Sequence, residues 1–138
     1  MTCDEIKEAA RKGIDIQLHT HRHRFPLDDP SLLQQELQAN RSVLNALTAK
    51  PLRHFCYPSG VWSPLAFSVL QKAGIESAVT TEQGLNFSPD SRLHLRRISD
   101  GEYVDELEFE AELTGFAELV RKVRRPFRTP SHETDEVS

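Results

Sequence analysis

Apolar residues recur at two different spacings along this chain, and each spacing predicts a different kind of element. In IDIQLHT, residues 14–20, every second residue as far as Leu18 is apolar, which is typical of a β-strand. Leucines at helical spacing follow Asp29 and Pro30, an N-cap residue and a first-turn proline, and predict a helix that ends near Ala49. The same criteria predict further helices over residues 3–13, 64–74 and 102–125, and further strands over residues 53–58, 76–81 and 93–98.

Strands that alternate with helices in this way favour an α/β fold built from βαβ units with a parallel sheet. In such folds, functional residues lie on loops that leave the carboxyl ends of the strands. Two stretches have that position: HTHRH follows the strand that ends near Leu18, and YPSG follows the strand that ends near Cys56. Both are therefore candidates for a functional site. The core is expected to include Phe55, Phe67, Leu70, Ile75 and Val79.

Length and composition narrow the class of protein. The 138 residues suit one domain or part of one, and the formal net charge of -4 gives no reason to expect nucleic acid as a partner. Cys3 and Cys56 lack CxxC spacing, so the sequence indicates neither a disulfide framework nor a cysteine zinc site. No stretch approaches the roughly 20 apolar residues of a membrane span. We expect a domain over residues 1–124 and a disordered tail over residues 125–138.

Three of the six histidines lie within LHTHRHRFP, residues 18–26. His19 and His23 are four residues apart, a spacing that places both side chains on one side of a helical turn or of an extended strand. Neutral imidazoles of this kind suit zinc, cobalt or nickel. His21 would join them only if the backbone is extended. The spacing alone leaves two interpretations open: a metal site, or a solvated loop whose histidines at most cap it.

The order of three motifs adds to this pattern. HTHRH fits H-[ST]-x-x-H, FCYPSG follows it, and AGIESAVTTEQGLN and LHLRRI come next. This series resembles the polysaccharide deacetylase family, over roughly residues 1–100. The resemblance implies a partial, irregular (β/α) barrel that lacks its first strand or strands, because the chain begins where a later helix of the family would lie. It also implies a metal-dependent hydrolase that removes acetyl groups from N-acetylated sugars.

The resemblance assigns roles to residues that match its motifs. His19 and His23 align with the two histidines that hold a divalent metal, most often Zn²⁺, and the Thr20 hydroxyl would steady their loop by a local hydrogen bond. The Tyr57 backbone N–H would help to form the oxyanion hole. Pro58 and Gly60 would shape that turn and contact the substrate, although the same residues also suit an ordinary tight turn.

Two further positions have open interpretations. Trp62 could stack on a sugar ring of an N-acetylated polysaccharide or oligosaccharide, or it could pack against a neighbouring helix. Arg97 is expected to have a structural or charge-positioning role. His94 lies near the place of the family's late histidine, but its register differs.

One departure from the family bears on activity. The family's T-F-D-D-G-like motif, which supplies a general base and a third metal ligand, is absent, and Asp28–Asp29 are interpreted as a helix cap. Without a base, hydrolysis loses a factor of roughly 10² to 10⁴, so we expect this chain alone to be nearly inactive. The alternatives are a non-catalytic glycan-binding or metal-binding remnant and a subunit completed by a partner chain.

The expected partners and location follow from the same features. An open sheet edge favours a homodimer. The basic run RKVRR follows an acidic segment, so we expect neither nucleic-acid nor membrane binding there. The amino terminus has no apolar signal-peptide core, which indicates a cytoplasmic protein as written, or one of the cell envelope if a leader has been lost.

Overall fold

The computed structural model describes residues 2–87 and 91–124. The chain divides into two compact units, Met1–Arg97 and Ile98–Ser138. The expected disordered tail, residues 125–138, lies outside the described residues. The domain boundary at residue 124 stays a prediction.

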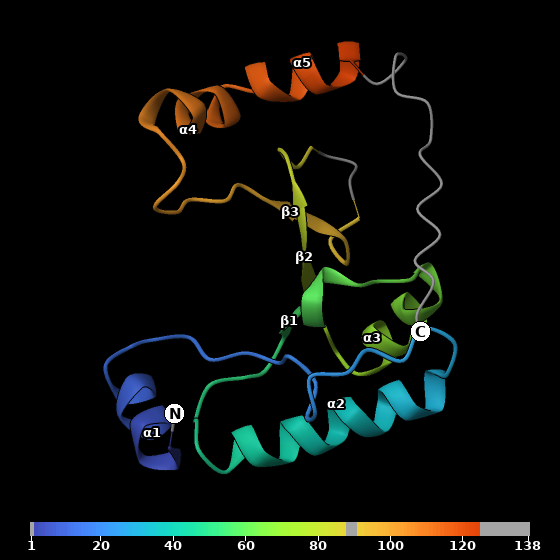
Figure 1. The fold of residues 1–138 in the computed structure, drawn as a ribbon. Helices are drawn as coiled ribbons and strands as arrows, with labels where there is room; N and C mark the ends of the chain where they lie inside the picture. Colours follow the sequence, from blue (N-terminus) through green and yellow to red (C-terminus); the bar gives the residue numbers. More distant parts are fainter. Residues whose placement is uncertain (1, 88–90, 125–138) are drawn as a thin grey trace, which may run out of the picture. The chain divides into compact units, whose positions relative to one another are not determined.

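The first unit contains a parallel three-stranded sheet (Figure 1). Its strands are β1 (His54–Cys56), β2 (Ser77–Gln83) and β3 (Leu95–Arg97), in the order β1-β2-β3. Phe55 lies opposite Ala78, and the β2–β3 register shifts between Val79 and Gln83. The predicted parallel sheet is confirmed. The sheet does not close on itself, as expected for part of an irregular (β/α) barrel.

The predicted strand over residues 14–20 is wrong in extent. Only Leu18 forms a bridge there, parallel to Phe55, with its N–H donating to the His54 carbonyl at 3.1 Å. Before it, the Gln17 side-chain carbonyl accepts the N–H groups of Arg53 (2.9 Å) and His54 (3.0 Å). A side chain therefore takes the place of main-chain ladder bonds, and the segment is held beside β1 without being a regular strand.

Three helices belong to the first unit: α1 (Cys3–Arg11), α2 (Pro30–Asn45) and α3 (Phe67–Lys72). The Asp29 carboxylate accepts the N–H groups of Ser31 and Leu32, which confirms the predicted cap. Helix α2 ends at Asn45, earlier than expected. Short 3₁₀ turns, η1 (Pro58–Gly60) and η2 (Pro64–Ala66), occupy the connection between β1 and α3.

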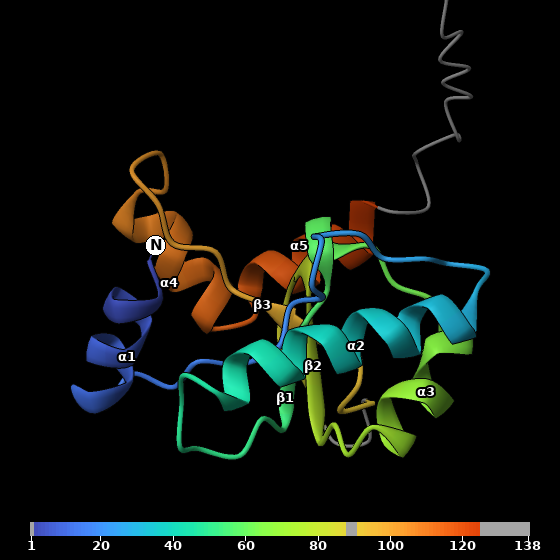
Figure 2. The same cartoon turned by 90° about the horizontal axis from the view of Figure 1, so that it is seen from below.

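The core lies where α2 and α3, which run side by side, meet one face of the sheet (Figure 2). Phe55, Leu70 and Ile75 are buried as predicted, and Phe67 packs against this cluster while partly exposed. Val79 is only half-buried, because alternate residues of β2 face opposite sides of the sheet. The buried apolar residues are Leu18, Leu33, Leu37, Leu44, Leu52, Phe55, Tyr57, Ala66, Leu70, Ile75, Ala78 and Leu93.

Over residues 98–124, the described part of the second unit, there are two helices where one was predicted. These are α4 (Glu106–Leu113) and α5 (Phe116–Arg124), separated at Thr114–Gly115, where Gly115 has φ +79°. The Arg121 guanidinium donates to both carboxylate oxygens of Glu112 and ties the two helices together. Within the part of the chain that the structure describes, no helix has the length and apolar character needed to cross a membrane.

Candidate metal centre

The histidine loop, residues 19–23, and the turn at Tyr57–Gly60 leave adjacent strand-like segments at the same end. Leu18 lies beside Phe55 in parallel, and the Cys56 N–H donates to the Leu18 carbonyl at 3.0 Å. His19 and Tyr57 therefore begin their respective connections from neighbouring points. The expectation that both stretches lie at the carboxyl end of the sheet agrees with this placement.

The structure brings the His19 and His23 side chains together. Their ring centroids are 4.9 Å apart with an interplanar angle of 60°. His19 Nδ1 lies 2.7 Å from the Cys56 carbonyl oxygen. Since a carbonyl can only accept, Nδ1 carries the proton and the lone pair is on Nε2. A backbone carbonyl that fixes the tautomer of a ligating histidine in this way is typical of metal sites.

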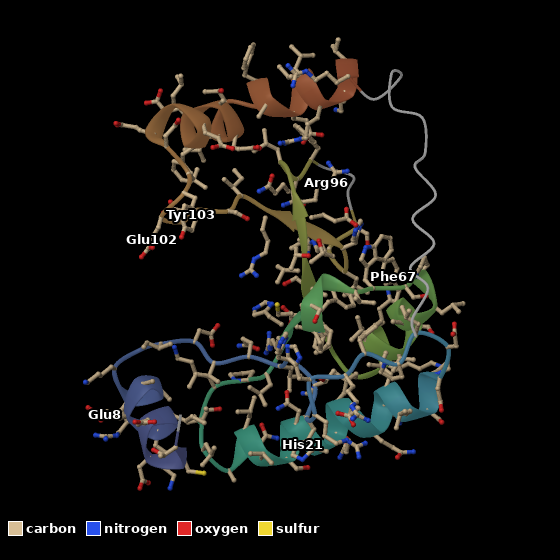
Figure 3. All side chains as sticks on the ribbon, in the orientation of Figure 1. Glu8, His21, Phe67, Arg96, Glu102 and Tyr103 are labelled. Atoms are coloured by element: carbon tan, nitrogen blue, oxygen red, sulfur yellow. The ribbon has the colours of Figure 1, made fainter. Side chains whose placement is uncertain are left out.

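The loop is not extended, and this separates His21 from the pair. Thr20 and His23 have positive φ angles of 59° and 55°. Left-handed backbone turns the chain within five residues, so alternate side chains no longer share a face. His21 has an exposed side chain (Figure 3), and its backbone N–H bonds to α2. Two imidazoles, not three, therefore converge.

The donor set suits a divalent metal only in part. The two neutral imidazoles are ligands that zinc accepts readily. In residues 2–87 and 91–124, however, no group of three or more His, Cys, Asp or Glu side chains is placed to hold a metal ion. Catalytic zinc sites usually take three protein ligands. The pair is thus two thirds of such a set.

Two polar residues of α2 hold the histidine loop, and sequence reasoning missed both. Asn40 Oδ1 accepts the His19 N–H at 3.0 Å. Glu36 Oε2 accepts the N–H groups of His21 (3.1 Å) and Arg22 (2.9 Å), and Glu36 Oε1 accepts Arg22 Nε at 2.6 Å. Their signal in the sequence was their position: they recur at helical spacing within the leucine stripe of α2.

The electrostatics of Glu36 follow from these bonds. Glu36 is only 3% exposed, and this burial by itself raises the pKa of its carboxyl group. Hydrogen bonds from the Arg22 N–H and guanidinium, together with the His21 N–H, outweigh that effect, so the pKa lies below its usual value. Glu36 therefore remains a carboxylate inside the protein.

The expected hydrogen bond from Thr20 is not formed. Thr20 is 5% exposed, and its Oγ1 has no partner among the described residues. The left-handed backbone at this residue points the side chain into the interior, where no acceptor lies within reach. The loop is instead steadied through its backbone by α2.

The Tyr57 backbone N–H is not free to bind an oxyanion, which corrects the sequence-based assignment. It donates to the Val79 carbonyl at 3.1 Å and continues the β1–β2 ladder by one residue. The side chain is buried, with its hydroxyl donating to the Leu93 carbonyl at 2.8 Å. Burial raises the pKa of that hydroxyl above its usual value. Two residues on, within η1, Ser59 has a left-handed backbone with φ +54°.

Pro58 and Gly60 shape this turn as the sequence suggests. Pro58 is buried, and the Gly60 N–H donates to the Tyr57 carbonyl at 2.9 Å. Gly60 has φ +71°, and a Cβ there would overlap the Thr81 side chain on β2. Only glycine meets both conditions. A substrate contact by either residue stays a prediction.

Trp62 has protein partners that account for its position. Its ring stacks on Phe67 at a centroid distance of 5.9 Å and lies 3.7 Å from the His94 ring, and its Nε1 donates to Glu82 at 2.8 Å. His94 Nε2 is 3.2 Å from Glu82 Oε1. The Trp62 bond is the largest cause that lowers the pKa of Glu82. These contacts favour packing, and stacking on a sugar stays a prediction.

Arg97 lies at the end of β3. Its side chain is exposed, and its carbonyl accepts the Gly84 N–H at 3.1 Å. The neighbouring Arg96 has both main-chain groups bonded to the side chain of Asn86, at 2.8 and 2.9 Å. Asn86 thus occupies part of the outer edge of β3, the kind of edge from which a homodimer was predicted. The dimer and the role of Arg97 both stay predictions.

Comparison with known proteins identifies the class. A family model for polysaccharide deacetylases matches residues 1–78. Since this is more than half of the 138 residues, the chain belongs to the polysaccharide deacetylase family. No curated protein sequence matches it.

Solved structures support the same fold. The chain is similar to the deacetylase PplD of Streptococcus pyogenes in complex with acetate, with 20% identity, a TM-score of 0.73, and coverage of 81% of this chain and 50% of PplD. It is also similar to a polysaccharide deacetylase from Bacillus cereus, with 24% identity, a TM-score of 0.70, and coverage of 82% of this chain and 36% of that protein. A third similar structure is IcaB from Ammonifex degensii, with 19% identity, a TM-score of 0.65, and coverage of 85% of this chain and 53% of IcaB. The chain therefore spans between about a third and a half of the structures that it resembles.

Proposed function

We propose that this chain carries the metal-binding histidines of a hydrolase that removes acetyl groups from N-acetylated polysaccharides or oligosaccharides. The family supports deacetylation of sugars in general. The observation that carries the proposal for this chain is the approach of the His19 and His23 rings to 4.9 Å, with His19 Nδ1 held by the Cys56 carbonyl. That arrangement leaves His19 Nε2 as a ligand beside a second imidazole.

A divalent metal, most often zinc in such sites, supplies Lewis-acid chemistry that activates water and polarises a carbonyl group. The role of the protein is to present His19 Nε2 and a nitrogen of His23 as neutral donors. A donor for the developing oxyanion is also needed. The Tyr57 N–H is already bonded to Val79, so the N–H of Ser59, in the turn that leaves β1, is the candidate donor instead.

The chain by itself should have little activity. Within the described residues no carboxylate completes the histidine pair as a group of three, so a third ligand is lacking there. The family's T-F-D-D-G-like motif, which would supply the general base, is absent from this sequence. Two imidazoles bind zinc weakly, and a missing base costs roughly 10² to 10⁴ in rate. The same observation favours the second candidate function, a metal-binding remnant without catalysis.

Zinc titration of the purified 138-residue chain tests the ligand assignment. We expect binding that falls at least tenfold in His19→Ala and in His23→Ala, while the control His54→Ala, a histidine bonded to Ser77 on the sheet, leaves the affinity unchanged. Equal affinity in all four proteins would refute the metal assignment.

Acetate release from an N-acetylated chito-oligosaccharide separates the two functions. The 138-residue chain is expected near background. A longer polypeptide that includes an in-frame upstream Asp-Asp segment is expected to release acetate, and His19→Ala should abolish that activity. If no such segment precedes Met1, or if the longer polypeptide stays inactive, the non-catalytic function is favoured.

A further inference from the structure

Three backbone N–H groups of the histidine loop donate to just two side chains of α2. Asn40 accepts the N–H of His19, and Glu36 accepts those of His21 and Arg22. The two acceptors are four residues apart, one helical turn, so they lie on the same face of α2.

This loop needs external support. Thr20 and His23 both have left-handed backbone, at φ +59° and +55°, which is strained for a residue with a Cβ and persists only when its surroundings fix it. The Thr20 hydroxyl supplies no hydrogen bond. The bonds to α2 are therefore the contacts that fix the backbone between the two candidate ligands.

Both carboxylate oxygens of Glu36 accept hydrogen bonds from the loop. A buried carboxylate without partners would be strongly destabilising, so its acceptor capacity must be filled. Arg22 fills it from one side, with Nε and an NH2 group each 2.6 Å from Oε1, while the loop N–H groups fill Oε2. Charge-assisted bonds of this kind are shorter and stronger than neutral ones. An uncharged amide of the same shape cannot reproduce them.

We propose that Glu36 and Asn40 are positioning residues that set the geometry of the His19–His23 metal site through the backbone of the loop. Neither side chain contacts a histidine ring. Both side chains act on the loop through its backbone N–H groups, and they fix the turn that brings the two rings together. The inference rests on the proposed metal-binding function, and it adds α2 to the machinery of the site.

The first test is zinc titration of the full chain. Glu36→Gln and Asn40→Ala should each lower the affinity about tenfold, as is typical when an outer partner of a metal ligand is removed. Asn40→Asp keeps the acceptor oxygen and should restore the affinity to within about threefold of wild type. Two control variants, Gln38→Ala on the exposed face of α2 and Glu110→Gln on α4, should bind as wild type. Far-ultraviolet circular dichroism checks that each variant folds.

A second measurement works without metal. Amide hydrogen exchange at His21 and Arg22 should quicken at least tenfold in Glu36→Gln, and exchange at His19 should do so in Asn40→Ala. Unchanged exchange in both variants overturns the inference, whatever zinc does. If the exchange quickens and the His19→Ala and His23→Ala variants lose zinc, but Glu36→Gln and Asn40→Ala do not, the metal site stands and the positioning role fails.

Discussion

The histidine loop and the Tyr57–Gly60 turn leave the sheet at the same end, but they are held in different ways. Both contain left-handed residues, Thr20 and His23 in the loop and Ser59 and Gly60 in the turn. The turn is fixed by its own sequence, through a proline, a glycine and one close contact with β2. The loop has neither proline nor glycine between residues 19 and 23, and α2 fixes it through side chains.

In the candidate site, the strained left-handed backbone of the turn is therefore held locally, and that of the loop is held by side chains of α2. A turn held locally keeps its shape whatever happens to α2. A loop held by distant partners can lose its shape when one of those partners is changed. Substitutions in the turn should therefore affect the stability of the whole unit, whereas substitutions around the loop should mainly affect metal binding.

Gly60→Ala should have the largest effect on stability. The new Cβ would meet the Thr81 side chain, and alanine also resists a φ of +71°, so we expect a loss of about 3 kcal/mol in the free energy of unfolding. Gly74→Ala is the matched control, because Gly74 has φ +75° with open space around the Cβ position. It should lose only about 1 kcal/mol. Urea denaturation measures both, and equal losses would show that contact with β2 is unimportant.

Tyr57→Phe should have a smaller effect. It removes the hydroxyl that donates to the Leu93 carbonyl and leaves that carbonyl buried without a partner, which costs about 1.5 kcal/mol. Tyr103→Phe serves as the control, because Tyr103 is 97% exposed. Its unfolding free energy should be unchanged. A Tyr57→Phe protein as stable as wild type would mean that the turn does not depend on this bond.

Thr20→Val should be close to neutral, within about 0.5 kcal/mol, because the hydroxyl that it removes has no partner. Valine is also β-branched, so the backbone strain stays the same. The comparison is Thr80→Val, which loses the hydrogen bond to the Leu95 carbonyl at 3.1 Å and the one accepted from the Glu82 N–H at 3.2 Å, and should cost at least about 1 kcal/mol. Thermal unfolding distinguishes them. A large loss in Thr20→Val would restore a role for the hydroxyl in the loop.

The pH dependence at Glu82 should be the smallest effect. The Trp62 indole N–H is the main cause that lowers the pKa of Glu82, burial opposes it, and His94 and Arg96 add to the lowering. A lowered folded-state pKa contributes stability above the ordinary glutamate value of about 4.3, and the contribution disappears as pH falls through the folded value. The stability difference between wild type and Glu82→Gln should therefore be largest above the ordinary glutamate pKa and shrink as the pH falls below it. A constant difference would contradict the assignment.

Features encoded within a few residues could be predicted from the sequence. The Asp29 cap, the β1 and β2 strands and the parallel arrangement follow from short patterns, and so does the Pro58–Gly60 turn. The approach of His19 to His23 agrees with the expected shared face, although left-handed backbone produces it.

Features that depend on partners far along the chain could not be predicted. Gln17 replaces ladder bonds only because Arg53 and His54 lie beside it. Glu36 could be recognised as a buried acceptor only once the loop was seen to return to α2. The Tyr57 N–H is occupied because the β1–β2 pairing continues one residue beyond the end of β1 at Cys56.

Whether His19 and His23 bind one metal ion together is tested most directly by ¹⁵N nuclear magnetic resonance of the imidazole nitrogens while Zn²⁺ is added. We expect the Nε2 signal of His19 and one ring-nitrogen signal of His23 to follow a single binding curve that saturates at one Zn²⁺ per chain. The signals of His21 and His54 should stay in place. If His19 and His23 respond separately, or not at all, the two imidazoles do not share a metal ion and the account is contradicted.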